Sequence, residues 1–144
     1  MDEGLPAASQ QATLRTIGES DVRATVRRWV RAWEDGDVDG LVAMLVDDAG
    51  YAMPPAPTWD RGREDVRRFL RTRPHAPGRR WRVAPTRVNG QLAFIVRRPD
   101  GGGGWSPHAV EVVTLAADGR VAEVVAFLDP AQVARVTAAE TPPG

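Results

Sequence analysis

The chain has 144 residues, a formal net charge of zero from 19 basic and 19 acidic side chains, and no cysteine. This length predicts one domain with a substantial core, and the lack of cysteine excludes disulfides, a thiolate nucleophile and a zinc–thiolate site. The balanced charge argues against a nucleic-acid-binding domain, which usually carries a basic excess. Every basic residue is an arginine, and a GC-rich genome is the simplest explanation for that bias.

The hydropathy pattern and the N-terminal sequence predict where the protein works. No run of about 18 apolar residues is present, so we expect no membrane span. The N-terminal sequence MDEGLPAASQ lacks the basic and apolar regions of a signal peptide. We therefore expect a soluble, cytoplasmic protein in which the small and polar residues 1–18 form a flexible arm.

Two helices are predicted after this arm. Apolar residues recur at helical spacing over 20–35, and Gly36 can take the left-handed conformation that ends a helix. Asp37 is a suitable N-cap for a second helix over 37–48. The two apolar faces comprise Val22, Val26, Trp29, Val30 and Trp33, and then Val38, Leu41, Val42 and Leu45.

The remaining chain predicts one more helix and then a run of strands. Tyr51 and Met53 form a short strand that the following prolines end, and a third helix covers 62–72. Asn89-Gly90 is a strong two-residue hairpin turn. The later elements are strands over 80–88, 91–98, 106–116 and 120–128, a short helix over 130–136, and a disordered tail over 137–144.

This order of elements predicts a single α+β domain over 19–136. We expect three N-terminal helices packed on a curved, mostly antiparallel sheet. Such a sheet buries one face under the helices, and its curvature leaves a pocket between the two layers.

A segment near the second predicted helix carries a family resemblance. The sequence WEDGDVDGLVAMLVDDA, followed by a short strand, resembles the SnoaL-like branch of the nuclear transport factor two-like superfamily. Taken together, the segments look most like the C-terminal SnoaL-like domain of certain actinobacterial extracytoplasmic-function sigma factors, and residues 5–18 resemble the linker that precedes that domain. The resemblance implies a half-open cone with a pocket at its mouth. Further similar stretches cover 58–70, 80–94, 107–115 and 119–130.

Glu111 is the first candidate catalytic residue. It lies in the middle of a predicted strand, on the face that alternation also gives to Ala109 and Val113. A buried glutamate has a raised pKa and can exchange a proton near neutral pH. The resemblance to ketosteroid isomerases, distant members of the superfamily, implies that this position faces the cavity. The alternative is a solvated glutamate on an open sheet face.

Tyr51 and His108 are the other catalytic candidates. Tyr51 can offer its phenol to a ligand, or it can be a core tyrosine with its hydroxyl at the rim. His108 is either a proton shuttle or a surface or dimer-interface histidine. Alternation places it on the face opposite Glu111, and a β-bulge near Pro107 would remove that objection.

Two catalytic patterns of related proteins are missing. Ketosteroid isomerases carry a catalytic aspartate on the first strand, and the resemblance places Met53 there instead. The second aspartate of the limonene-epoxide-hydrolase-like triad would fall near Ala126, and Asp129 suits a turn before Pro130 better. No phosphate loop or cluster with metal-ligand spacing is visible, so we expect neither cofactor nor metal.

The aromatic residues predict an apolar ligand. Trp29 and Trp33 lie on the core face of the first helix, and Trp59 follows a proline-rich segment where it could cover the cavity. A cavity of this character fits a polyketide or terpenoid-like compound. The expected ligand-binding residues are Trp29, Trp33, Met53, Trp59, Phe69, Phe94, Ala109, Val113, Val124 and Leu128.

Three functions remain open from the sequence. The first is a cofactor-free cyclase, isomerase or epoxide-opening enzyme that acts on a natural-product intermediate. The second is a ligand-binding regulatory domain related to a sigma factor, or a fragment of one, without its DNA-binding regions. The third is an assembly module that forms a homodimer through the outer sheet face. That face would comprise His108, Val110, Val112, Val125 and Phe127.

Overall fold

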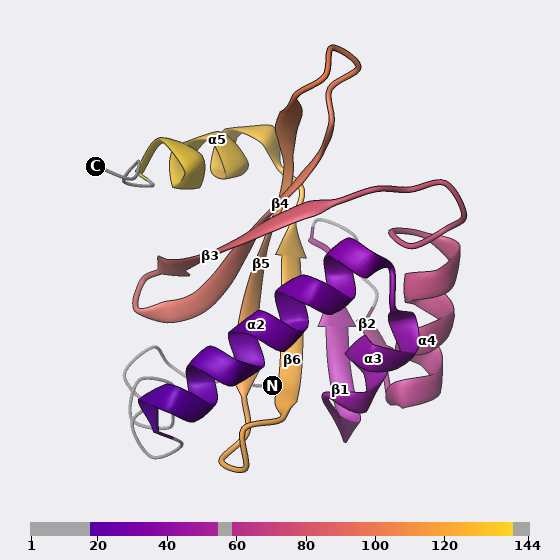
Figure 1. The fold of residues 1–144 in the computed structure, drawn as a ribbon. Coiled ribbons are helices and arrows are strands. Elements are labelled where there is room, and N and C mark those ends of the chain that lie inside the picture. Colours follow the sequence, from indigo (N-terminus) through magenta and orange to yellow (C-terminus); the bar gives the residue numbers. More distant parts are fainter. Residues whose placement is uncertain (1–17, 55–58, 140–144) are drawn as a thin grey trace.

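A curved sheet of six strands runs through residues 18–54 and 59–139, the part of the chain that the computed structural model describes (Figure 1). The strand order is β2-β1-β6-β5-β4-β3, and only β1 and β6 pair in parallel. The sheet is therefore mostly antiparallel, as the sequence predicts. The strands are β1 (Leu45–Ala52), β2 (Trp59–Arg61), β3 (Arg82–Val88), β4 (Gln91–Pro99), β5 (Trp105–Leu115) and β6 (Val121–Phe127).

Helices cover both faces of this sheet. α2 (Glu19–Asp35), α3 (Val38–Ala43) and α4 (Arg63–Thr72) pack their buried side chains on one face. α5 (Pro130–Ala139) lies against the other face, where its Val133 contacts Val110 of β5. Figure 1 shows α2 crossing in front of the strands and α5 beyond them. α5 runs to Ala139 where the sequence predicted an end at 136, and residues 1–17 and 140–144, most of the predicted arm and tail, lie outside the described residues.

The junction of the first two helices agrees with the sequence prediction. Gly36 ends α2 with a φ of 69°, in the left-handed region that glycine adopts without strain. The Asp37 side chain then accepts a hydrogen bond of 2.9 Å from the Gly40 N–H, which caps α3. The two caps turn the chain sharply and place both apolar helix faces against the sheet.

The prediction that the second helix reaches residue 48 is wrong. α3 ends at Ala43, and the strand β1 begins at Leu45, which pairs with Val121 of β6. The register then shifts between Leu45 and Gly50. The pattern of a short apolar run fits a helix and a strand equally well, so its tertiary contacts determine its secondary structure. Here the contact is with β6.

The predicted group of three N-terminal helices is also not observed. Only α2 and α3 precede the sheet among the described residues, because β1 and β2 come before α4. β2 has three residues and pairs with β1 through Gly50, Tyr51 and Ala52. The sequence did not predict β2, because its pairing with β1 is the main feature that makes it a strand.

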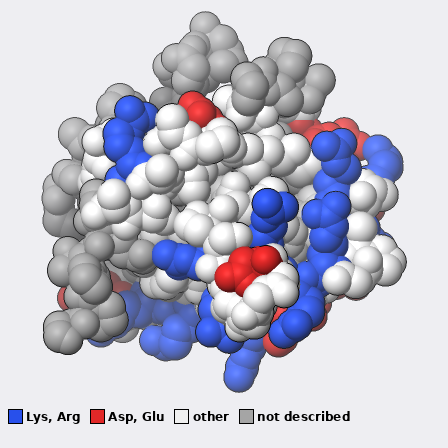
Figure 2. Space-filling model, turned by 90° about the horizontal axis from the view of Figure 1, so that it is seen from above, with Lys and Arg blue, Asp and Glu red and all other residues white. Residues whose placement is uncertain are grey.

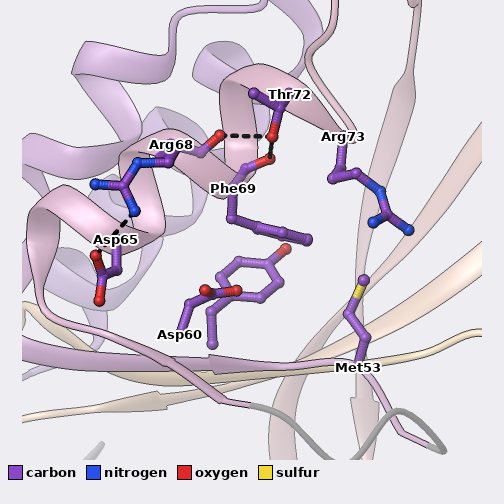
Figure 3. A pocket seen from close by; sticks show the side chains of 8 residues that line it. Met53, Asp60, Asp65, Arg68, Phe69, Thr72 and Arg73 are labelled. Carbon is purple, nitrogen blue, oxygen red and sulfur yellow. Dashed lines mark hydrogen bonds and ion pairs between the residues drawn. The ribbon is translucent and has the colours of Figure 1, made fainter.

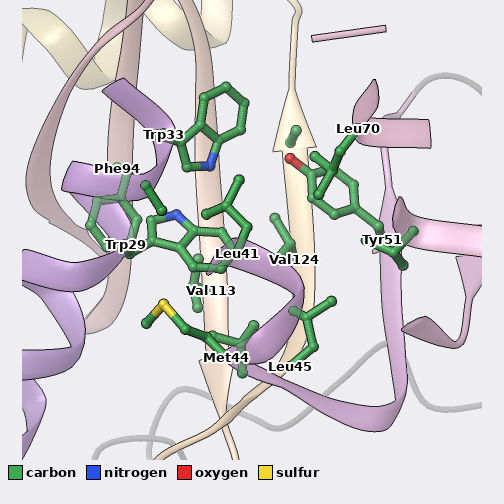
Figure 4. Packing of buried hydrophobic residues seen from close by; sticks show 14 of the residues in the cluster. Trp29, Trp33, Leu41, Met44, Leu45, Tyr51, Leu70, Phe94, Val113 and Val124 are labelled. Carbon is green, nitrogen blue, oxygen red and sulfur yellow. The ribbon is translucent and has the colours of Figure 1, made fainter. Parts of the chain in front are cut away.

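A single apolar core fills the space between α2–α4 and the sheet. Trp29 and Phe94 are among the largest fully buried side chains, with 6.2 Å between their ring centroids. Figure 4 shows Leu41, Leu45 and Val124 packed in the same layer. Most of the volume that the sequence assigned to a cavity is therefore occupied by side chains. An open pocket remains near α4.

Candidate functional site

Glu111 is the one charged residue that is buried in the described part of the chain, with 1% of its surface exposed. It lies in the middle of β5, between Phe94 of β4 and Ala126 of β6. Its neighbours on the same face, Ala109 and Val113, belong to the apolar core. The predicted burial of Glu111 is thus confirmed, and a buried carboxyl of this kind needs polar partners.

Two elements bring hydrogen-bond donors to this carboxyl group. β1 supplies Tyr51, whose hydroxyl donates to Glu111 Oε2 across the intervening strand β6. α2 supplies Trp29, whose indole N–H donates to Glu111 Oε1 over 3.3 Å. Three segments far apart in the sequence therefore converge on one carboxyl group, and both of its oxygens are bonded.

Burial sets the protonation state of this pair. It raises the pKa of Glu111 to about 7, and the hydrogen bonds from Tyr51 and Trp29 offset part of that rise. Burial also raises the pKa of Tyr51 well above its ordinary value, and the nearby Glu111 adds to the effect. Glu111 can therefore gain or lose a proton near neutral pH, whereas Tyr51 keeps its own.

A pocket of about 330 Å³ opens beside Tyr51, between α4 and the β1–β2 edge. The Tyr51 ring forms part of its wall, and the Phe69 ring lies 5.0 Å away between centroids. Figure 3 shows charged side chains around the same space. The pocket is lined by Tyr51, Met53, Asp60, Asp65, Arg68, Phe69, Thr72 and Arg73.

The structure divides the predicted ligand-binding residues into three groups. Met53 and Phe69 line the pocket together with Tyr51. Trp59 is 38% exposed and lines a groove on the outer sheet face with Val112 and Phe127, so it does not cover the inner pocket. The others belong to the apolar core, except that Leu128 is partly buried and packs against it: Trp29, Trp33, Phe94, Ala109, Val113, Val124 and Leu128.

The pocket is more polar than the sequence predicted. It contains Asp60 from β2 and Arg73 from the end of α4, in addition to the ion pair between Arg68 and Asp65. The apolar cavity expected from the tryptophans is instead packed core. Sequence reasoning missed Asp65 and Arg68 because the third predicted helix was interpreted only through its inward face, and it missed Asp60 and Arg73 because they lie outside that helix. For that helix the available signal was the pair of opposite charges at Asp65 and Arg68.

His108 does not join the Glu111–Tyr51 pair. The register between β4 and β5 shifts there, from Val96 opposite Ala109 to Arg97 opposite Pro107, so a bulge does occur at the predicted place. The His108 ring packs on Trp81 with 5.1 Å between centroids, and no hydrogen bond from it reaches Glu111 or Tyr51 within the described residues.

The surroundings of His108 are aromatic and cationic. Burial lowers its pKa, and the charges of Arg98 and Arg79 lower it further. Nearby, Arg80 and Arg82 stack on Trp105. Figure 2, which views the molecule from above, shows arginine side chains gathered along one side of it. These effects favour the neutral form of His108, whose ring packs on Trp81.

Two further kinds of feature are absent from residues 18–54 and 59–139. No three His, Asp or Glu side chains there come close enough together to hold a metal ion. None of the helices in these ranges combines the length and apolar character needed to cross a bilayer.

Comparisons with known proteins agree on the type of domain. Residues 26–124 match a family model described as a SnoaL-like domain. Among curated proteins, the chain is 33% identical over 106 residues to the ECF RNA polymerase sigma factor SigG of Mycobacterium tuberculosis. That alignment covers 71% of this chain and only 27% of the sigma factor, so the chain matches a minor part of that protein.

Solved structures share the fold at low identity. A putative polyketide cyclase from Xanthomonas campestris has a TM-score of 0.57 at 18% identity, covering 81% of this chain and 97% of its own. A putative ketosteroid isomerase from Kribbella flavida has a TM-score of 0.59 at 23% identity, and the match covers 87% of this chain and 84% of the isomerase. SalBIII, an epoxide hydrolase/cyclase-like enzyme of pyran ring formation in salinomycin, has a TM-score of 0.60 at 20% identity, and the match covers 79% of this chain and 95% of SalBIII.

Proposed function

The chain belongs to the SnoaL-like domain family, and we propose that it is a cofactor-free enzyme of the cyclase, isomerase or epoxide-opening type. The observation that carries this proposal is the buried hydrogen bond between Glu111 and Tyr51, because the ring of Tyr51 lines the pocket. A carboxyl group with a pKa of about 7 is costly to retain in a core and suited to proton transfer.

The pair can deliver a proton to a substrate oxygen in the pocket. Tyr51 has one hydroxyl proton, which it donates to Glu111 when that group is ionised. When Glu111 is protonated, its O–H can donate to the Tyr51 oxygen, and the Tyr51 proton is then free for a carbonyl or epoxide oxygen. As the Tyr51 proton moves to the substrate, the Glu111 proton replaces it, and Glu111 is left as the carboxylate.

Trp29 has a supporting part in this mechanism. Its N–H donates to the second oxygen of Glu111, which fixes the carboxyl plane and leaves Oε2 directed at Tyr51. The bond also stabilises the carboxylate that remains after proton transfer. Met53 and Phe69 provide the apolar surface beside the reacting group.

A natural-product intermediate of the polyketide or terpenoid kind is the substrate class that we propose. The aromatic wall of Tyr51 and Phe69 suits a flat unsaturated body, and the structural neighbours include proteins described as a polyketide cyclase and an epoxide hydrolase/cyclase-like enzyme. In an enolisation, the Tyr51 proton would go to the carbonyl oxygen while a water molecule in the open pocket takes the proton from the neighbouring carbon; in an epoxide opening, the Tyr51 proton would go to the epoxide oxygen.

Deuterium exchange tests the proposal with simple ketones in place of the natural substrate. A panel of enolisable aromatic ketones would be incubated with the protein in heavy water and followed by NMR. We expect protein-dependent exchange that falls about 100-fold in Glu111→Gln. The matched control is Glu123→Gln, at a glutamate of β6 on the outer groove, which should exchange as the wild type does. Equal exchange by both variants would refute the role of Glu111.

A ligand-binding regulatory domain is the second candidate. Its support is the resemblance to SigG, in which a domain like this one would be a small part of a longer regulator. In that case the pocket would bind the same ketones without exchange, and Glu111→Gln would change affinity and nothing else. Binding and exchange measured on the same panel therefore separate the two functions.

A further inference from the structure

The pocket holds two charged side chains that make no hydrogen bond or ion pair within the described residues. These are Asp60, which lies in β2, and Arg73, which is the first residue after α4. Figure 3 shows them on opposite sides of the space, with Phe69 between them. The other charges of the lining, Asp65 and Arg68, pair with each other over 3.3 Å and so offer less to a ligand.

The helix end fixes the positions from which these groups act. The Arg73 N–H donates to the Phe69 carbonyl over 3.0 Å, which ties its backbone to the last turn of α4. The Thr72 hydroxyl donates to the carbonyls of Arg68 and Phe69. Thr72 is therefore already satisfied by the helix, and Arg73 supplies the available positive charge on its side of the pocket.

The opposite side is fixed by strand pairing. Asp60 lies directly across from Tyr51 in the β1–β2 register, so its carboxylate is held beside the proposed proton donor. An ionised carboxylate only accepts hydrogen bonds, whereas a guanidinium only donates them, and it suits a planar anion. The two ends of the pocket thus differ in the groups that they can recognise.

We propose that the substrate is a flat carboxylic acid with a hydroxyl group at its far end. Arg73 binds the carboxylate, Asp60 accepts the hydroxyl hydrogen bond, and the rings of Tyr51 and Phe69 contact the body between them. The proposal rests on the proposed function, to which it adds a substrate class. It also sets one orientation, because a carboxylate placed at the Asp60 side would meet a like charge.

A set of three aromatic probes tests both ends of the pocket. The probes are a hydroxynaphthoic acid, its methyl ester, and the naphthoic acid without the hydroxyl, with binding measured by calorimetry. We expect the hydroxy acid to bind about tenfold more tightly than its ester, because only the acid forms the charge-assisted pair with Arg73. It should bind several-fold more tightly than the acid that lacks the hydroxyl.

Matched variants locate each preference. Arg73→Met should remove the difference between acid and ester, and Arg73→Lys should retain part of it. Arg71→Met is the control, since Arg71 lies in the last turn of α4, two residues before Arg73, but pairs with Asp39 and does not line the pocket. Asp60→Ala should remove the preference for the hydroxylated acid and leave the preference for acid over ester in place.

Equal binding of acid and ester by the wild type would overturn the proposal, as would no binding of any probe or an equal effect of Arg71→Met. These outcomes are distinct from a failure of the proposed function. If the acid preference depends on Arg73 while deuterium exchange ignores Glu111, the pocket assignment stands and the enzyme proposal falls. If deuterium exchange depends on Glu111 while Arg73→Met still binds the acid more tightly than the ester, the enzyme proposal stands and the pocket assignment falls.

Discussion

Glu111 and His108 lie on the same strand, β5, and burial shifts the pKa of each toward its neutral form. Their partners differ. Both oxygens of Glu111 receive hydrogen bonds, from Tyr51 and Trp29, whereas His108 packs on the ring of Trp81 with arginines beyond it. A buried titratable group is a candidate for proton transfer when hydrogen bonds connect it to a pocket, as they connect Glu111 through Tyr51. Without such hydrogen bonds it only contributes to packing.

The two groups also respond to pH in opposite directions. The folded protein favours protonated Glu111 and unprotonated His108, relative to the unfolded chain. The stability that Glu111 contributes is therefore lost as pH rises, and the stability that His108 contributes is lost as pH falls. Variants of each residue can separate these effects.

The largest expected effect comes from Glu111→Gln. The Glu111 contribution is complete below its ordinary pKa of 4.5 and declines as pH rises through about 7. At still higher pH, ionisation of Glu111 costs the wild type about 3 kcal/mol of unfolding free energy, which the neutral glutamine avoids. Urea unfolding across this range should show the variant gaining on the wild type by that amount. A constant difference between the two proteins at all pH values would contradict the raised pKa.

Tyr51→Phe should have an intermediate effect. The phenylalanine keeps the ring in the pocket wall and removes the donor that favours ionised Glu111. The pKa of Glu111 should then rise further, by about one unit. A carboxyl-carbon NMR titration would measure this change. Trp29→Phe is the companion variant and should produce a smaller rise, because its bond to Glu111 is 3.3 Å long. A fall in the Glu111 pKa in Tyr51→Phe would show that the bond is not made in solution.

The sequence predicted the parts of this site that follow from local pattern. Alternation in β5 grouped Glu111 with Ala109 and Val113 on one face, and the caps at Gly36 and Asp37 marked the junction between α2 and α3. These features depend on residues near one another in the chain. The family resemblance implied that Glu111 faces a cavity, whereas in the structure Glu111 is buried in the core and only its partner Tyr51 lines the pocket.

The rest of the site depends on contacts between distant segments. The early end of α3 needs β6 as a partner for Leu45, and β2 exists through its pairing with β1. Asp60 and Arg73 come to one pocket only because β2 and the end of α4 meet there. No periodicity within either segment marks that meeting. The expected apolar cavity failed for the same reason, since the way Trp29 and Phe94 fill the space is a property of packing.

His108→Leu should have the smallest effect and the opposite pH dependence. Leucine keeps an apolar contact with Trp81 and cannot be protonated, so the variant should resist acid better than the wild type does. Near pH 8 we expect its unfolding free energy to lie within about 1 kcal/mol of the wild type. Below the ordinary histidine pKa of 6.5 the difference should move in favour of leucine. His75→Leu is the comparison, because burial lowers the pKa of His75 to about 4 and its gain in acid should be larger. Loss of deuterium exchange in His108→Leu, with folding intact, would place His108 in the catalytic machinery and end the contrast with Glu111.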